Sequence, residues 1–162
     1  MILRLTQKAM QKIRLEKRDV NADDNITVSP LSEWYVNHFM LDRRGYFIIT
    51  ESISLFSIIE PSVKISNIKI FREWITNLIR KFEMENKLKI NTIDTNIIHI
   101  CKTNNRSIVG SQNDLVKMAK AMYYYDDKKN IDTSFVNKTP MSYTNSFPDK
   151  DIEVEIKRSR DF

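Results

Sequence analysis

The segment SEWYVNHFMLDRRGYFIIT, residues 32–50, carries the clearest fold signal in this chain. Its two halves are rich in aromatic and β-branched side chains, which favour strands. A polar stretch at 42–45, which includes Gly45, separates the halves and is typical of a turn. We therefore expect a β-hairpin with strands at 32–41 and 46–50.

A third strand is predicted at residues 54–59, because this apolar run precedes Pro61 and continues the pattern of the hairpin. A short helical start after residue 52 is the alternative for this run. An antiparallel meander is the simplest arrangement of the three strands.

An amphipathic helix is predicted at residues 66–88, where the sequence changes to a helical period. Its apolar side chains recur three and four residues apart and form one wide stripe. They are Phe71, Trp74, Ile75, Leu78, Ile79 and Phe82. Because burial of each is worth about 1.5 to 3 kcal/mol, we expect the stripe to cover the sheet.

The rest of the chain completes an α+β fold. Residues 2–6 alternate as a short strand, and residues 7–17 form a short basic helix. Residues 96–102 are predicted as a strand and residues 112–125 as a helix. The expected fold is an antiparallel sheet with the 66–88 and 112–125 helices packed on one face. The remaining segments are the expected loop at 19–29 and the polar C-terminal tail at 141–162, where we expect coil or a short strand near 152–156.

Composition excludes several classes of protein. The 162 residues are 41% hydrophobic and include two glycines and four prolines. We expect one domain at 1–140, and Gly-rich cofactor loops are not expected. The single cysteine, Cys101, precludes an internal disulfide and suits a reducing compartment. Without a secretory signal or an apolar run of about 20 residues, a soluble cytoplasmic protein is expected.

The stretch TNNRSIVGSQND, residues 103–114, is the best candidate for a site. Ser111 and Asp114 have the spacing of a capping box, which predicts a helix that starts at Ser111. Gly110 before it provides backbone freedom. Free N–H groups at the helix start favour an anion, and Arg106 could clamp a phosphate or carboxylate. The alternative is that these polar groups only satisfy one another.

A second candidate set lies in the first hairpin strand. Alternation places Glu33, Tyr35 and Asn37 on one face, where Glu33 and Asn37 could share a polar site. The alternative is a core tryptophan flanked by solvated polar residues. The ligand-binding candidates are Arg4, Asn37, Asn105, Arg106, Ser107, Ser111 and Asn113. The candidate general bases are Glu33 and Asp114.

Metal ligands are scarce, because His38 and His99 are the only histidines and Cys101 is the only thiol. A zinc site would need three of these plus a carboxylate from scattered positions, so no metal and no other cofactor is expected. Cys101 and His99 could pair on one strand face as nucleophile and base. A lone cysteine in an apolar strand is more typical of a small core residue.

The charge balance of 26 basic to 21 acidic residues, net +5, permits a polyanionic partner without demanding one. The basic side chains that could meet such a partner are Lys8, Lys12, Arg14, Lys17 and Arg18 in the first helix and Arg43 and Arg44 in the hairpin turn. Tyr123, Tyr124 and Tyr125 could stack on bases or contact a protein partner. A membrane partner is not expected.

Four motifs distributed along the chain indicate a family resemblance. They are MxLRxTxK at 1–8, EWYxN at 33–37, TxNRSxxGSxND at 103–114 and NxTPM at 137–141. The chain resembles an uncharacterised bacterial family of small single-domain proteins that occurs in plasmid and mobile-element contexts. It has Gln112 where that family favours Met, and Ser32 where Gly often precedes the acidic residue.

The resemblance implies no activity, cofactor or substrate. It implies that six residues should be tested first: Glu33, Asn37, Asn105, Arg106, Asn113 and Asp114.

Three functions remain open at this point. The first is a non-enzymatic accessory or regulatory protein that binds an anionic partner such as nucleic acid, through Arg4, Arg106 and the basic helix and turn. The second is a small hydrolase or transferase for a phosphorylated or nucleotide-like ligand, with Arg106 as clamp and Glu33 or Asp114 as base. The third is a protein-interaction subunit that uses Tyr123, Tyr124, Tyr125 and the tail.

Overall fold

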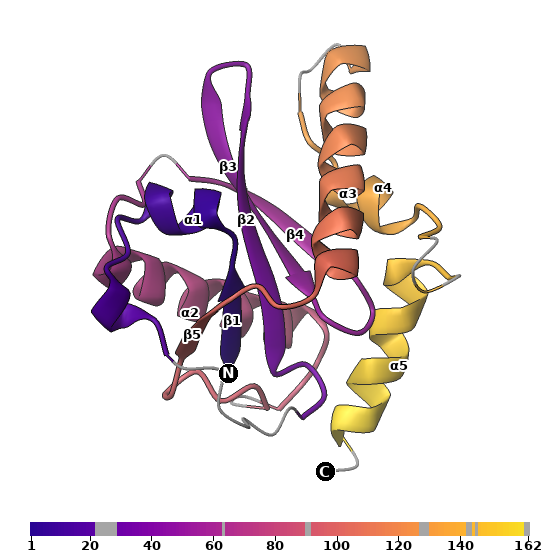
Figure 1. Ribbon diagram of the computed structural model, residues 1–162. Helices are drawn as coiled ribbons and strands as arrows, with labels where there is room; N and C mark the ends of the chain where they lie inside the picture. The colour runs from indigo at the N-terminus through magenta and orange to yellow at the C-terminus, as the bar shows by residue number, and fades with distance from the viewer. Residues whose placement is uncertain are drawn as a thin grey trace.

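A five-stranded mixed sheet forms the centre of the protein (Figure 1). The computed structural model describes residues 1–21, 29–62, 64–89, 92–126, 130–141, 144 and 146–160. The strands are β1 (Ile2–Leu5), β2 (Glu33–Leu41), β3 (Arg44–Glu51), β4 (Ser57–Pro61) and β5 (His99–Lys102), in the order β4-β3-β2-β1-β5. The predicted hairpin is confirmed as β2 and β3.

The expectation of a purely antiparallel sheet is wrong in one half. β2, β3 and β4 form the antiparallel meander, whereas β1 lies between β2 and β5 and runs parallel to both. Parallel neighbours require crossover connections, so they pair segments that lie far apart in sequence. The alternation in a four-residue strand carries no information about the direction of its partner.

Six helical segments complete the described structure. They are α1 (Gln7–Lys12), the 3-10 helix η1 (Lys17–Asp19), α2 (Ile68–Glu85), α3 (Arg106–Tyr125), α4 (Thr133–Asn137) and α5 (Pro148–Arg160). α1 is shorter than the expected 7–17 helix, because the chain leaves the helical region at Arg14, with a left-handed φ of 53°. None of the helices in the described ranges has the length and apolar character needed to cross a membrane.

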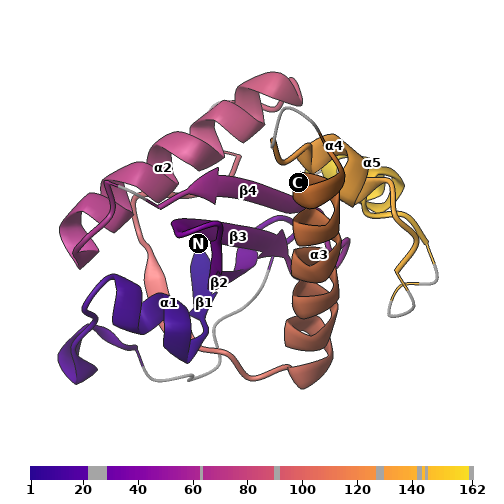
Figure 2. The same cartoon turned by 90° about the horizontal axis from the view of Figure 1, so that it is seen from above.

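α2 and α3 pack on different faces of the sheet, so the expectation of two helices on one face is wrong (Figure 2). Trp34 joins the core that contains α2, and its ring meets Phe82 edge-on with centroids 5.4 Å apart. The next residue, Tyr35, joins the second core with Leu115 of α3. Because successive strand residues point to opposite faces, the apolar side chains of β2 are divided between both cores.

α3 begins six residues before the expected start of the 112–125 helix, so the capping-box prediction at Ser111 is wrong. The side chain of Asn105 caps the helix, and its Oδ1 accepts hydrogen bonds from the N–H groups of Ser107 and Ile108 at 3.0 and 3.3 Å. Asn is as good an N-cap as Ser. Ser111 is buried within the helix.

Gly110 lies inside α3 without a left-handed φ, and a Cβ added there would meet nothing within 4 Å. We expect Gly110→Ala to raise the free energy of unfolding by about 0.5–1 kcal/mol, because glycine loses more backbone entropy in a helix than alanine does. Urea denaturation measures the change. A loss of stability would contradict this expectation and would indicate that the helix requires a residue without a side chain at position 110.

Gly45 provides the opposite control. A Cβ at this position would lie 2.5 Å from Ser62 Oγ and 2.8 Å from His38 Nε2. Gly45→Ala should therefore destabilise the protein. The two substitutions together distinguish Gly45, where a side chain would clash, from Gly110, where a side chain has room.

The expectation of coil or a short strand near 152–156 is wrong, because this segment belongs to α5. Ile152 and Ile156 are buried in the core that contains α2, and their spacing of four residues places them on one helical face. Acidic residues lie in the first turn and basic residues in the last, which suits the helix dipole. Most of the loop expected at 19–29 lies outside the described residues.

α4 protects the edge of the sheet at β4. The Asn137 side chain donates from Nδ2 to the carbonyl oxygen of Ser57 and accepts at Oδ1 from the Ser57 N–H, both at 2.8 Å. The amide thereby pairs with backbone groups that a neighbouring strand would otherwise bind. Unpaired groups at an exposed edge could pair with another chain. β4 itself starts at Ser57, three residues later than predicted.

Candidate functional site

A hollow of about 480 Å³ opens at the amino end of α3. The chain leaves β5, crosses the sheet and enters α3, so that the crossing segment meets the start of β2 (Figure 1). We call this the α3 hollow. Its lining residues are Glu33, Tyr35, Ser52, Ile53, Asn104, Asn105, Arg106 and Ile108. Two of the predicted polar segments, 33–37 and 103–114, therefore meet in one place.

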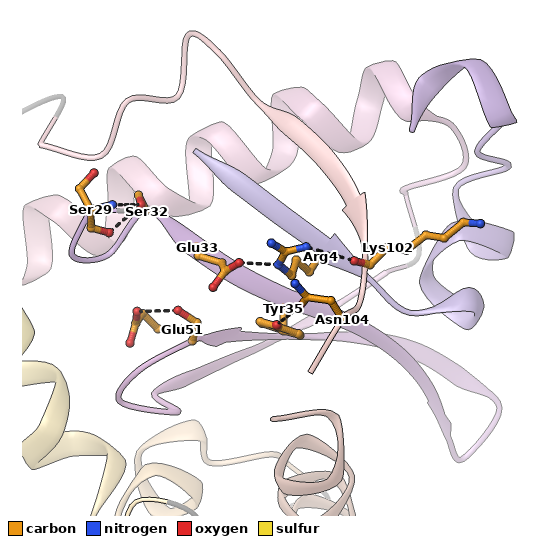
Figure 3. Close-up of polar contacts among 9 residues, drawn as sticks. Arg4, Ser29, Ser32, Glu33, Tyr35, Glu51, Lys102 and Asn104 are labelled. Atoms are coloured by element: carbon orange, nitrogen blue, oxygen red, sulfur yellow. Dashed lines mark hydrogen bonds and ion pairs between the residues drawn. The ribbon is translucent and has the colours of Figure 1, made fainter. Parts of the chain in front are cut away.

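A buried ion pair supports one side of the α3 hollow. Arg4 of β1 and Glu33 of β2 lie on neighbouring parallel strands, and Arg4 Nε donates to Glu33 Oε1 (Figure 3). Their side chains are 8% and 13% exposed. Arg4 Nη1 also donates to the carbonyl oxygen of Lys102 at 3.4 Å, at the end of β5. The charge of Arg4 is thus balanced within the protein.

The crossing segment is held on the sheet by Tyr35. Its hydroxyl donates to Asn104 Oδ1 at 2.6 Å (Figure 3). Asn105 follows as the N-cap of α3, and the exposed Arg106 is the first residue of the helix. Arg106 therefore stands at the positive end of a 20-residue helix dipole.

Asn37 and Asn113 also meet, in a network outside the α3 hollow. Thr6 Oγ1 donates to Asn37 Oδ1 at 2.8 Å, and Asn37 Nδ2 donates to Asn113 Oδ1 at 3.3 Å. The N–H of His38 also donates to Asn37 Oδ1, at 2.9 Å. This network joins β2 to the start of α1 and to the middle of α3, which is a structural role.

The remaining predicted site residues do not line the α3 hollow. Ser107 is exposed and Ser111 is buried. Asp114 is exposed on α3 and pairs with Lys117 at 2.8 Å. Of the two candidate bases, Glu33 therefore lines the α3 hollow together with Arg106, and Asp114 does not.

Gln112 is an important residue that the sequence reasoning missed. It is fully buried, and its Nε2 donates to the carbonyl oxygen of Tyr35 at 2.9 Å and to Thr50 Oγ1 at 3.1 Å. These bonds hold α3 on β2 and β3. The available signal was its position between Ile108 and Leu115, on the apolar face of the helix.

The basic residues of α1 and of the hairpin turn lie apart from the α3 hollow, because none of them lines it. The charges of Lys8 and Lys12 instead affect the pKa of His38. His38 Nε2 lies 3.1 Å from Ser62 Oγ. Burial lowers the pKa of His38, and the charges of Lys12 and Lys8 lower it further. Among the described residues, no group of three His, Cys, Asp or Glu side chains could hold a metal ion.

The three tyrosines at the end of α3 have different environments. Tyr123 is a core residue whose hydroxyl donates to Asp42 Oδ2 at 3.1 Å. Tyr124 and Tyr125 are 67% and 91% exposed. The predicted cluster is therefore divided between core and surface.

The sequence model of one protein family, described as a domain of unknown function (DUF6933), matches residues 2–150. The chain belongs to this family. The match includes all residues that line the α3 hollow and supports the expected membership of an uncharacterised family. A comparison with curated proteins found no match, and neither did a comparison with solved structures.

In this member of the family, the α3 hollow combines one exposed cation with neutral polar groups and a carboxylate that is already paired. Arg106 can donate two parallel hydrogen bonds to a phosphate or carboxylate. Asn104 and Ser52 line the same space and offer neutral polar groups. Such an arrangement can hold an anion beside the buried pair of Arg4 and Glu33.

Proposed function

We propose that the protein binds a small phosphorylated or carboxylated ligand in the α3 hollow and acts as a non-enzymatic accessory or regulatory protein. The observation that carries this proposal is that Arg106 lines a polar hollow of about 480 Å³ at the amino end of α3. A guanidinium and a helix dipole favour negative charge at the same point.

A small ligand suits this arrangement better than an extended nucleic acid. Arg4, a residue of the expected basic surface, is buried and paired with Glu33, so its charge is not offered to a phosphate backbone. Arg106 is the cation that lines the α3 hollow, whereas the residues of α1 and the hairpin turn do not. Nucleic-acid binding normally uses a continuous basic footprint.

Binding is also favoured over catalysis. A general base must accept a proton from the reacting group. Glu33 already accepts a hydrogen bond from Arg4, and Asp114 pairs with Lys117 outside the hollow. Neither carboxylate is placed as an unengaged base beside Arg106.

Calorimetric titration with inorganic phosphate and with adenosine monophosphate tests the proposal. We expect both to bind, and Arg106→Ala to raise Kd by about 10-fold or more, because a charge-assisted bond is worth about 1.5–3 kcal/mol. NMR shift changes on titration should centre on residues 104–108.

The matched control is Lys117→Ala, which removes an exposed cation of α3 outside the hollow and should leave Kd unchanged. A single-stranded oligonucleotide is the competing ligand. The proposal is wrong if this oligonucleotide binds more tightly than phosphate and loses affinity in Lys8→Ala and Lys12→Ala but not in Arg106→Ala.

A further inference from the structure

A second hollow, of about 540 Å³, lies beside α5 and adjoins the first. We call it the α5 hollow. Its polar lining comes from Ser52, Thr144, Asp151, Glu155 and Arg158. Ser52 and its neighbour Ile53 line both hollows, so the turn after β3 forms a common wall of the two spaces.

Glu155 in this hollow has an unsatisfied oxygen. The residue is 3% exposed, and its Oε1 accepts from Arg158 Nη1 at 2.7 Å. Its Oε2 is buried and has no hydrogen-bond partner among the described residues, and the same holds for Thr144 Oγ1. A buried acceptor that lacks a donor costs the free energy of its desolvation. The site therefore has a place for a donor group.

A second buried carboxyl group, that of Glu51, lies near Glu155. Glu51 lies behind the turn, where its Oε2 accepts from the N–H groups of Ile53 and Ser54 at 3.0 and 2.7 Å. Burial raises the pKa of Glu51, and the charge of Glu155 raises it further. Among the described lining residues, Arg158 is the single cation beside the carboxyl groups of Asp151 and Glu155. A cationic ligand would balance this excess.

We propose that the α5 hollow binds a protonated primary amine that donates to Glu155 Oε2, and that this amine belongs to the ligand whose anionic group lies in the α3 hollow. The second half of this inference rests on the proposed function. An ammonium group carries three donors, which suits the oxygens of Glu155, Asp151 and Ser52. A metal ion fits less well, because the described residues contain no group of three suitable ligands.

Matched pairs of ligands test the inference. Calorimetry on the full chain compares ω-aminoalkyl phosphates with alkyl phosphates of the same chain length, from ethyl to pentyl. We expect at least one amine to bind about tenfold more tightly than its matched alkyl phosphate, which is the effect of one charge-assisted hydrogen bond. Glu155→Gln should remove this difference while the alkyl phosphate keeps its affinity.

Two further variants show whether the effect of Glu155→Gln is specific to the α5 hollow. Asp151→Asn removes the second carboxyl group of the α5 hollow and should reduce the preference for the amine. Glu153→Gln changes an exposed charge on the same helix and should retain the full preference. Circular dichroism of each variant verifies that α5 is intact.

The inference is overturned if no amine binds more tightly than its matched alkyl phosphate, or if Glu155→Gln keeps the difference. Failure of the proposed function gives another pattern, in which alkyl phosphates do not bind. In that case, binding of 1,5-diaminopentane to the wild type is measured. If the diamine binds the wild type but not Glu155→Gln, the amine site is supported without the proposed function. If the diamine does not bind either, both proposals fail.

Discussion

Trp34→Ala should lower the free energy of unfolding by about 3–5 kcal/mol, the range for removal of a large aromatic residue from a core. Trp34 is fully buried in β2. Its ring packs edge-on against Phe82 of α2, with an interplanar angle of 80°, and its indole N–H donates to the carbonyl oxygen of Leu31 at 2.7 Å. The substitution therefore leaves a cavity and an unpaired buried carbonyl. Equilibrium denaturation in urea measures the loss.

Two controls separate these contributions. Trp34→Phe keeps a ring against Phe82 and removes the donor to Leu31, so its effect should be smaller. Trp74→Ala removes the same side chain from a half-buried position on α2 and should also cost less. An effect of Trp34→Ala no larger than that of Trp74→Ala would show that the sheet does not depend on this contact.

The second large effect is expected at the ion pair of Arg4 and Glu33. Glu33→Leu should lower the free energy of unfolding by about 3–5 kcal/mol, because it leaves the buried guanidinium without its carboxylate. Both side chains are nearly buried. The double substitution Arg4→Met with Glu33→Leu should cost less than the sum of the two single changes, because it removes both charges together. Urea denaturation of the four proteins gives the coupling energy.

The pair of Lys117 and Asp114 on α3 is the matched reference. Their side chains are 77% and 61% exposed, so a coupling of about 1 kcal/mol or less is expected from the same cycle. A coupling for Arg4 and Glu33 as small as this would mean that solvent reaches the buried pair. The charge of Arg4 would then be available to a ligand.

Part of the candidate site could be read from the sequence. Asn105 and Arg106 were found because polar residues gather before a helical stripe, and Glu33 was found because strand alternation gives it the face of Tyr35. These three residues and Tyr35 line the α3 hollow. Their common location depends on the crossing from β5 to α3, and no local pattern contains that information.

Other site residues could not be found in this way. Ser52 and Ile53 lie in a turn whose sequence resembles any short polar connection, and Glu155 lies in a helix that was not predicted. Asn37 and Asn113 were chosen as ligand-binding candidates, and the bond between their side chains lies outside the α3 hollow. A residue type and its spacing show which groups are available for chemistry, and tertiary contacts show which of them share a space.

The sequence by itself determined the hairpin of β2 and β3 and the helix α2, because both rest on properties of neighbours in the chain. Aromatic and β-branched side chains around a polar turn predicted the hairpin, and the period of apolar residues predicted the helix. The tertiary structure alone decided that β1 runs parallel between β2 and β5, and that α2 and α3 take opposite faces. A strand buried on both faces has no polar side to indicate where its neighbours lie, so those choices rest on packing between distant segments.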